Sequence, residues 1–245
     1  MVLDADSLLS EDRLCFSVQK LDLGRNTLVM ELANKTAFIT GGASGLGLAT
    51  ARNFVAAGAN VFLYDLNAES LAASASEFGN NVKWQAGDVA DEAAVKSAVA
   101  SAIDHFGTIH INVNSAGIGG AARTVGKNGP MPLERFEHIV RVNLVGTFNV
   151  LRLCAEVMQT NEPQTEDQER GVIINVASIA AFDGQTGQAG YAASKGGIVA
   201  MTLPIARDLA KRGVRIMTIA PGVFETPLLA GAPDEVKEPL IAITQ

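Results

Sequence analysis

The stretch "TGGASGLG" at 40–47 decides how this chain folds, because it lies between a short apolar run and a helix-like stretch. The run before it is "TAFIT" at 36–40, and the helix-like stretch covers 45–57. Gly41, Gly45 and Gly47 let the backbone turn sharply and approach a pyrophosphate closely. The helix N-terminus supplies free N–H groups and the positive end of its dipole. A glycine-rich turn alone is weak evidence, but this setting favours a dinucleotide-binding βαβ unit.

Short β-branched or apolar runs alternate with Ala-rich helical stretches along the rest of the chain. After 36–40, the predicted strands are 60–64, 82–86, 110–116, 171–178 and 214–221, and the predicted helices are 67–78, 91–106, 133–158 and 190–212. This alternation predicts a parallel sheet with helices on both faces. Runs of Val and Ile are typical of strands that are buried on both sides. We therefore expect an α/β fold, a doubly wound parallel sheet of six recognisable strands in a single domain.

The composition excludes several classes of function. Hydrophobic residues make up 48% of the 245 residues, which is enough for a sizeable core. The net charge of −7 argues against a nucleic-acid footprint, which is normally basic. No apolar run reaches the roughly 18 residues that a membrane span needs, so we expect no membrane partner.

Cysteines and histidines show no pattern that would bind a metal ion. Cys15 and Cys154 lack the spacing of a metal or disulfide motif, and two reduced thiols are the simplest interpretation. His105, His110 and His138 are scattered, so surface or hydrogen-bonded core positions are expected for them. We predict no metal site.

Acidic and small residues at the ends of the next strands extend the predicted cofactor site. Asp65 follows the glycine-rich turn by roughly 20 residues, where a carboxylate can bind the adenosine ribose hydroxyls and repel a 2′-phosphate. This position favours NAD over NADP, although an Asp that caps a helix would look similar. Asp88 could accept a hydrogen bond from the adenine amino group, or it could cap a turn. The small residues of "NSAG" at 114–117 leave room for a cofactor at the end of the fourth strand.

Three residues near the fifth strand form a candidate catalytic set. Tyr191 and Lys195 lie one helical turn apart, and Ser178 ends the strand before them. A free Tyr has a pKa near 10. A nearby Lys ammonium would lower this pKa, and the phenol could then exchange a proton with a substrate oxygen that Ser178 holds. Each residue alone has a structural alternative, since Tyr–Lys pairs are common on solvated helices.

These residues together resemble the short-chain dehydrogenase/reductase family from about Lys35 onward. The resemblance rests on the T-G-x-x-x-G-x-G turn at 40–47, N-S-A-G at 114–117 in place of the usual N-N-A-G, Asn143, the Ser178–Tyr191–Lys195 set, and Pro221 with Gly222. It implies a Rossmann-type fold, a nicotinamide cofactor and hydride transfer to a carbonyl. It also implies that Asn143 is catalytic, holding a water in a proton relay from Lys195.

A narrower resemblance within this family points to a branch that uses NAD and oxidises 3-hydroxyacyl-CoA esters and some hydroxysteroids. Two long loops, at 117–132 and 160–171, fit this branch. The branch implies a mitochondrial homotetramer and places Ser178 against the substrate. The implied cofactor contacts are Ser44, Leu46, Asp65, Asp88, Val89, Ser115, Tyr191, Lys195, Phe224 and Thr226, and the motif residues Gly41, Gly45, Gly47, Asn114, Gly117 and Pro221 complete the predicted cofactor site.

The two ends of the chain depart from the family pattern. We expect an N-terminal extension at 1–34 and a dinucleotide-binding domain at 35–245 that lacks the usual seventh strand. That lack would leave the sixth strand as a sheet edge. The N-terminus also lacks the Arg-rich look of a mitochondrial presequence, so a cytoplasmic location stays open beside the mitochondrial one. The alternatives to an active dehydrogenase are a non-catalytic dinucleotide-binding subunit and an inactive truncated fragment.

Overall fold

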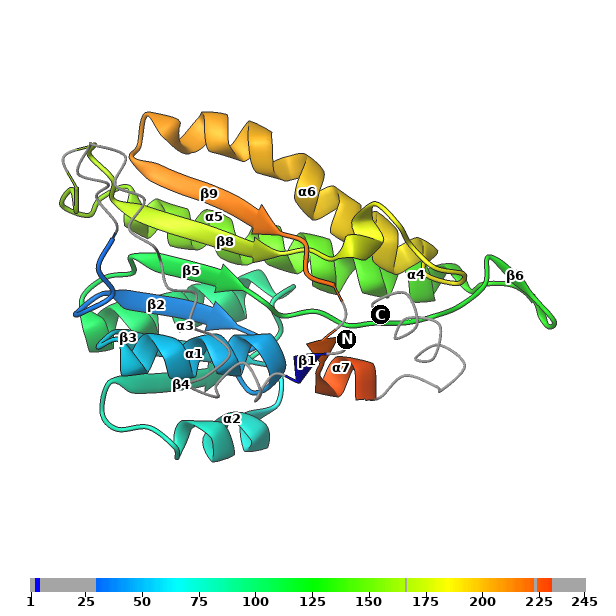
Figure 1. Cartoon of the computed structure of the whole chain (residues 1–245), viewed down its shortest axis with the longest axis horizontal. Coiled ribbons are helices and arrows are strands. Elements are labelled where there is room, and N and C mark those ends of the chain that lie inside the picture. Colours follow the sequence, from blue (N-terminus) through cyan, green and yellow to red (C-terminus); the bar gives the residue numbers. More distant parts are fainter. Residues whose placement is uncertain (1–2, 5–29, 166, 223, 231–245) are drawn as a thin grey trace.

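Six parallel strands form the central sheet, in the spatial order β4-β3-β2-β5-β8-β9 (Figure 1). The computed structural model describes residues 3–4, 30–165, 167–222 and 224–230. The strands are β2 (Thr36–Thr40), β3 (Asn60–Asp65), β4 (Val82–Ala86), β5 (Ile111–Asn114), β8 (Gly171–Val176) and β9 (Val214–Ile219). All six predicted strands are thus present, within a few residues of their predicted ends.

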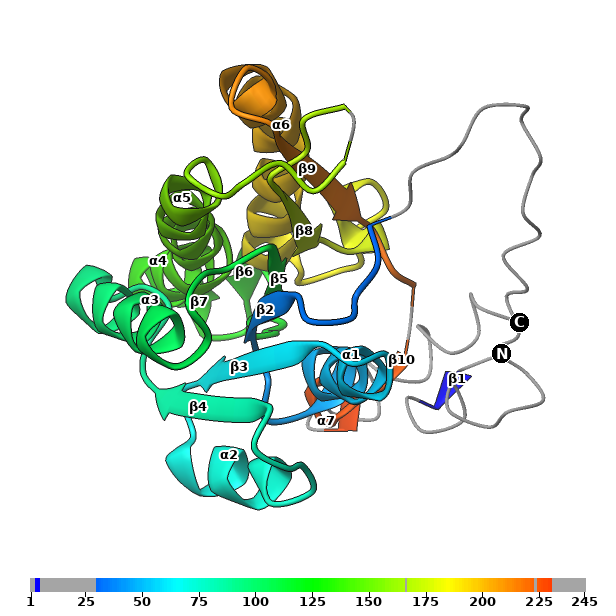
Figure 2. The same ribbon diagram turned by 90° about the vertical axis from the view of Figure 1, so that its left-hand side faces the viewer.

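Helices cover both faces of the sheet (Figure 2). They are α1 (Gly45–Ala56), α2 (Ala68–Ala75), α3 (Glu92–Phe106), α4 (Leu133–Val140), α5 (Gly146–Met158), α6 (Ala189–Ala210) and α7 (Pro227–Ala230). Helices α3, α5 and α6 pack on one face, where stacked Phe38 and Phe62 have ring centroids 5.4 Å apart. Helices α1 and α2 pack on the other face around Leu63 and Leu71. The prediction of a doubly wound parallel α/β sheet is confirmed.

The strand order reverses direction at β2, whose neighbours are β3 on one side and β5 on the other. Beyond β3 the sheet continues to β4, and beyond β5 it continues to β8 and β9. Open α/β sheets bind ligands at such a switch point, outside the carboxyl ends of the strands. The glycine-rich turn follows β2 directly, so the fold places this turn at the switch point.

The helix predicted over 133–158 is present, but it is not regular throughout. A π-helical turn, η2 (Arg141–Val145), separates α4 from α5. Asn143 lies in this turn and is fully buried, and its side-chain amide bonds both the N–H and the carbonyl of Ile118. Single π turns are frequent at functional sites, because they aim a side chain that a regular helix would not.

Short elements occur in segments for which no secondary structure was predicted. A two-stranded hairpin, β6 (Val125–Gly126) with β7 (Gly129–Pro130), lies within the long loop at 117–132. A 3-10 turn, η3 (Ile179–Ala181), follows β8. The short strand β1 (Leu3–Asp4) pairs in parallel with β10 (Phe224–Glu225).

Parts of the predicted ends lie outside the described residues. These are Cys15, most of the proposed extension at 1–34, and everything after Ala230. Within the described sheet, β9 is an edge strand, and Met217 and Ile219 are exposed on it. None of the helices in the described ranges is long and apolar enough to cross a bilayer.

Candidate active site

The glycine-rich turn is packed so tightly that two of its glycines admit no side chain. A Cβ built on Gly47 would lie 2.2 Å from the carbonyl oxygen of Gly41. Gly41 has a φ of +66°, and a Cβ there would lie 2.8 Å from the backbone nitrogen of Ala116. The turn therefore lies directly against the backbone that follows β5.

The N-terminus of α1 is well suited to an anionic group. Its N-cap residue, Ser44, makes no side-chain capping bond, and the first turn of α1 carries no acidic residue. Backbone N–H groups at a helix N-terminus bind phosphate when a side chain does not cap them. The close-packed turn and this helix end fit the pyrophosphate of a dinucleotide.

Asp65 lies beside the same turn and is not a helix cap. Its carboxylate accepts a hydrogen bond from the backbone N–H of Ala43 at 3.2 Å and one from Asn67 at 3.3 Å. The N-cap of α2 is Asn67, whose side chain accepts from the N–H of Ser70. The capping alternative for Asp65 is thus wrong, and the carboxylate stands at the end of β3, next to the glycine-rich turn.

Three residues of the predicted cofactor site make local contacts of their own. The Asp88 carboxylate accepts from the N–H of Ala90 at 2.8 Å, so the turn-capping interpretation of Asp88 holds. Val89 is buried, and its carbonyl accepts from the side chain of Asn149 on α5. The Asn114 side chain is buried in the sheet, where it donates to Asn112 at 2.7 Å and to Asn175 at 2.9 Å. Their contacts with a cofactor stay predictions.

The remaining predicted cofactor residues surround the turn or flank Ser178. Thr226 lies beside Gly45, since a Cβ on that glycine would be 3.6 Å from the Thr226 side chain. The Pro221 carbonyl accepts from the N–H of Ile179, the residue after Ser178. Leu46 lies in the first turn of α1, Ser115 follows β5, and Phe224 lies in β10.

The catalytic candidates Ser178, Tyr191 and Lys195 converge where β8 meets α6. The Ser178 side chain forms a hydrogen bond with the Tyr191 side chain. The Lys195 ammonium lies 5.7 Å from the centroid of the Tyr191 ring and donates to the carbonyl of Val176 at 2.7 Å. Lys195 is buried, with 5% of its surface exposed. The structure therefore brings the three predicted side chains together.

The expected lowering of the Tyr191 pKa is wrong for this structure. Burial raises the pKa of the Tyr191 phenol, and the hydrogen bond with Ser178 only partly opposes this effect. Burial also lowers the pKa of Lys195 to about 8, so the same desolvation weakens the cation that was expected to stabilise the phenolate. The prediction rested on the charge of Lys195 alone. It left out the free-energy cost of burying the Tyr191 phenolate and the Lys195 ammonium.

Asn143 stands close to the same set. A Cβ built on Gly117 would lie 3.2 Å from the amide oxygen of Asn143 and 3.6 Å from the Lys195 ammonium. The segment after β5, the η2 turn and the helix α6 therefore meet at one point. Asn143 and Lys195 thus lie close together, and the catalytic role that the family resemblance implies for Asn143 stays a prediction.

Two hydroxyl groups in this region were not predicted as functional. Thr40 ends β2, and its hydroxyl accepts from the N–H of Ala116, which joins the glycine-rich turn to the segment after β5. Ser194 lies between Tyr191 and Lys195 on α6, and its hydroxyl accepts from the Asn143 side chain at 3.1 Å. Ser194 could have been noticed as a polar residue in an Ala-rich helix, one turn after Tyr191.

Other titratable groups are not arranged as a site. His105 and His138 are exposed, and the ring of His110 accepts from the N–H of Thr36 at 3.1 Å. These positions agree with the prediction of surface or hydrogen-bonded histidines. Across the part of the chain that the structure describes, no three His, Cys, Asp or Glu side chains are grouped so that they could hold a metal ion.

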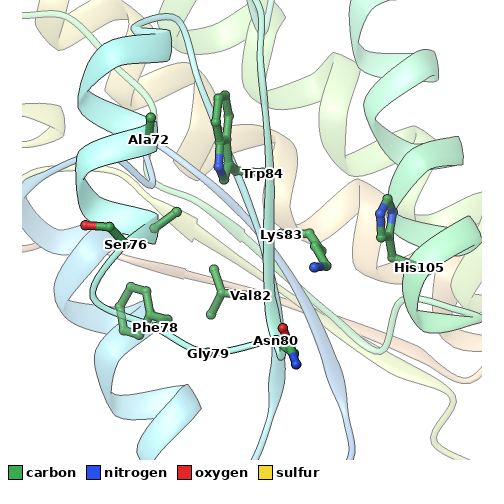
Figure 3. A pocket seen from close by; sticks show the side chains of 10 residues that line it. Ala72, Ser76, Phe78, Gly79, Asn80, Val82, Lys83, Trp84 and His105 are labelled. Atoms are coloured by element: carbon green, nitrogen blue, oxygen red, sulfur yellow. The ribbon is translucent and has the colours of Figure 1, made fainter.

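A surface pocket of about 440 Å³ lies at the β4 edge of the sheet, and no predicted site residue lines it (Figure 3). Trp84 and Val82 point toward α2, while Lys83 lies on the side of His105 and α3. Trp84 is 40% exposed at this pocket. The pocket is separate from the Tyr191 region.

A dinucleotide turn at the switch point of a parallel sheet, with a Ser–Tyr–Lys set beside it, defines a nicotinamide-dependent oxidoreductase. The short chain dehydrogenase family matches residues 35–237. A human protein named 3-hydroxyacyl-CoA dehydrogenase type-2 is 54% identical over 202 residues, which is 82% of this chain and 77% of the human protein. The chain therefore belongs to the short chain dehydrogenase family.

Solved structures of similar proteins support the same assignment. The crystal structure of 3-hydroxyacyl-CoA dehydrogenase type-2 from Mycobacterium avium has a TM-score of 0.77 and 37% identity, covering 85% of this chain and 82% of that one. A 3-ketoacyl-(acyl-carrier-protein) reductase from Brucella melitensis, solved in complex with NADH, has a TM-score of 0.74 and 36% identity, covering 81% and 80%. The chain is thus an oxidoreductase that acts on hydroxyl-bearing substrates with a nicotinamide cofactor.

Proposed function

We propose that this chain is an NAD-dependent dehydrogenase that oxidises 3-hydroxyacyl-CoA esters, with hydroxysteroids as a second substrate class. The observation that carries the proposal is the convergence of Ser178, Tyr191 and Lys195 beside the segment after β5, which packs against the glycine-rich turn. The substrate class is supported by the name of the human relative, 3-hydroxyacyl-CoA dehydrogenase type-2, and by its 54% identity.

The roles of the chain's own residues follow from these contacts. A bound nicotinamide cofactor would supply the acceptor for the hydride that leaves the carbinol carbon of the substrate. The Tyr191 oxygen takes the hydroxyl proton, and the Ser178 hydroxyl holds the same substrate oxygen by a hydrogen bond. The Lys195 ammonium lies 5.7 Å from the centroid of the Tyr191 ring, and its bond to the Val176 carbonyl holds it there. Asn143 sets the position of the segment after β5 against α6.

The assignment of NAD rather than NADP rests on Asp65. Its carboxylate lies at the end of β3 and accepts from the N–H of Ala43 in the turn, so a 2′-phosphate placed there would meet a negative charge. Asn in place of Asp65 would keep a hydrogen-bond acceptor for Ala43 and remove the charge. We therefore expect Asp65→Asn to lower the preference for NAD over NADP by about tenfold or more in kcat/KM.

Steady-state kinetics with both cofactors would measure this preference. Glu69→Gln is a suitable control, because it also removes one negative charge. Glu69 is exposed in the first turn of α2, four residues after Asp65. An unchanged cofactor ratio in Asp65→Asn would remove the basis for the NAD assignment.

The substrate proposal is tested by following NADH formation from a short 3-hydroxyacyl-CoA and, in parallel, from a hydroxysteroid. Turnover of the acyl-CoA ester is the expected result. Folded protein that binds NADH and oxidises neither substrate would contradict the proposal and favour a non-catalytic binding role.

Assembly and location are further parts of the proposal. The family resemblance supports a homo-oligomer, and the exposed apolar side chains of Val145, Phe148 and Leu203 on η2, α5 and α6 offer surface for one. A purely monomeric chain in sedimentation experiments would contradict it.

The resemblance also supports a mitochondrial location, which fractionation of cells expressing the chain would test.

A further inference from the structure

A fully buried serine lies between the two ionisable residues of α6. Ser194 has no exposed surface, although its neighbours Tyr191 and Lys195 face the candidate site. Its hydroxyl donates to the backbone carbonyl of Tyr191 at 2.7 Å and accepts from the side-chain amide of Asn143 at 3.1 Å. A serine hydroxyl has one hydrogen to donate, so the bond to Tyr191 fixes its lone pairs toward Asn143.

The hydrogen bond from Asn143 to Ser194 gives the last hydrogen of the Asn143 side-chain amide a partner. The Asn143 oxygen accepts from the N–H of Ile118 at 2.8 Å, and its nitrogen donates to the carbonyl of Ile118 at 3.0 Å. The second hydrogen of the nitrogen goes to Ser194. Because Asn143 is fully buried, no water replaces a partner that is lost. Its orientation is therefore fixed by the segment after β5 on one side and by α6 on the other.

We propose that Ser194 is a positioning residue for the reaction, which locks the Asn143 amide to the turn of α6 that carries Tyr191 and Lys195. The inference rests on the proposed dehydrogenase function, because the effect is exerted on the groups that this function uses. The proposed role needs no contact of Ser194 with substrate or cofactor. It acts through Asn143 and through the carbonyl of Tyr191.

The close packing around Asn143 explains how a small displacement would reach the site. The backbone at Gly117 is in near contact with both the Asn143 oxygen and the Lys195 ammonium. A turn of α6 that shifts relative to η2 changes the distance between Tyr191 and the segment after β5. Displacements of about 1 Å in a catalytic arrangement can reduce the rate by about 10²-fold.

Thr202 offers a matched comparison on the same helix. Its hydroxyl also donates to the carbonyl of the preceding turn, that of Ile198, at 2.8 Å. Its second partner is the hydroxyl of Thr218 on β9 and not a residue of the site. A role of Ser194 that was only to stabilise the helix would therefore be shared by Thr202.

The test compares Ser194→Ala with Thr202→Ala in the full chain. We expect Ser194→Ala to lower kcat about tenfold with little change in KM, and to shift the pH at which turnover is half-maximal. Thr202→Ala should keep both kcat and the pH profile, even where it lowers the melting temperature. Ser194→Cys puts a slightly larger thiol in place of the hydroxyl, as a weak acceptor for Asn143 and a weak donor to the Tyr191 carbonyl, so it should give an intermediate kcat.

A double-mutant cycle identifies the residue through which Ser194 acts. In an Asn143→Ala background, Ser194→Ala should lower kcat no further, because the partner of the hydroxyl has already been removed. Full additivity of the two substitutions would overturn the proposal. An unchanged kcat and pH profile in Ser194→Ala would also overturn it, while the dehydrogenase function would stand.

Two further outcomes are decisive. If Ser194→Ala does not fold, Ser194→Cys is compared with the wild type, and a Cys variant with unchanged kcat and pH profile overturns the positioning role. A folded wild-type chain that oxidises no substrate would overturn the dehydrogenase function and this role together.

Discussion

Replacing Tyr191 with Phe should reduce turnover by about 10²–10⁴-fold, the range that general acid–base catalysis contributes. The substitution removes one oxygen, which bonds the Ser178 side chain and is the proposed group for proton exchange with the substrate. The ring stays, so its contact with the Lys195 ammonium is kept. NADH binding, measured by fluorescence titration, should change little.

The second tyrosine of the chain provides a control for this substitution. Tyr64 is fully buried on β3, and its hydroxyl donates to the Asp88 carbonyl at 3.2 Å, at the other end of the predicted cofactor site. Tyr64→Phe removes the same atom and should lower the stability by about 1 kcal/mol while keeping kcat at saturating NAD. Tyr191→Phe with wild-type kcat would remove Tyr191 from the mechanism.

The pH dependence of the two directions follows from the raised pKa of Tyr191. In the proposed mechanism, oxidation needs the Tyr191 phenolate to take the substrate proton, and burial makes that form scarce at neutral pH. The rate of alcohol oxidation should therefore rise as the pH increases above neutrality. Carbonyl reduction needs the protonated phenol and should be favoured at lower pH. Rates in both directions as a function of pH would check the sign.

The sheet could be predicted from the sequence because its signals are local and periodic. The glycines of the turn, the Val- and Ile-rich runs and the helical stretches each determine nearby backbone, and the parallel order follows from their alternation. Tyr191 and Lys195 could be paired for the same reason, since residues one helical turn apart share a face.

The parts of the site that sequence reasoning missed depend on contacts between distant segments. The π turn at η2 exists where Asn143 reaches Ile118, and nothing in the residues 133–158 indicates that contact. Ser194 gains its partner only when η2 packs against α6. The pKa of Tyr191 depends on how deeply its ring is buried, which the spacing of residues does not show.

The interpretation of Asp65 shows where a motif is informative and where it is ambiguous. Sequence position alone allowed a helix cap or a ribose-binding carboxylate. The structure excludes the cap, because Asn67 holds that place and Asp65 accepts from Ala43 in the turn. The contact with a bound ribose stays a prediction that the cofactor-preference experiment addresses.

A single methyl group at Gly47 should disable the cofactor site. The added Cβ of Gly47→Ala would lie 2.2 Å from the Gly41 carbonyl oxygen and 3.2 Å from that of Thr40. Both neighbours are backbone atoms, so relief requires the turn to move by roughly 1 Å away from α1. We expect NADH affinity to fall by about 10²-fold and stability to fall by about 1–3 kcal/mol.

Gly196→Ala is the matched control, because Gly196 is also helical but has room for a side chain. A Cβ there would lie 3.8 Å from the Ala181 carbonyl oxygen, an ordinary van der Waals distance. Alanine is the better helix former, so this variant should gain about 0.5–1 kcal/mol and bind NADH as the wild type does. Helix propensity favours Ala over Gly at both positions. A loss of stability and NADH binding in Gly47→Ala but not in Gly196→Ala would therefore be due to the backbone clash at the turn. NADH titration and urea denaturation of both variants decide the point, and tight NADH binding by Gly47→Ala would show that the turn does not hold the cofactor.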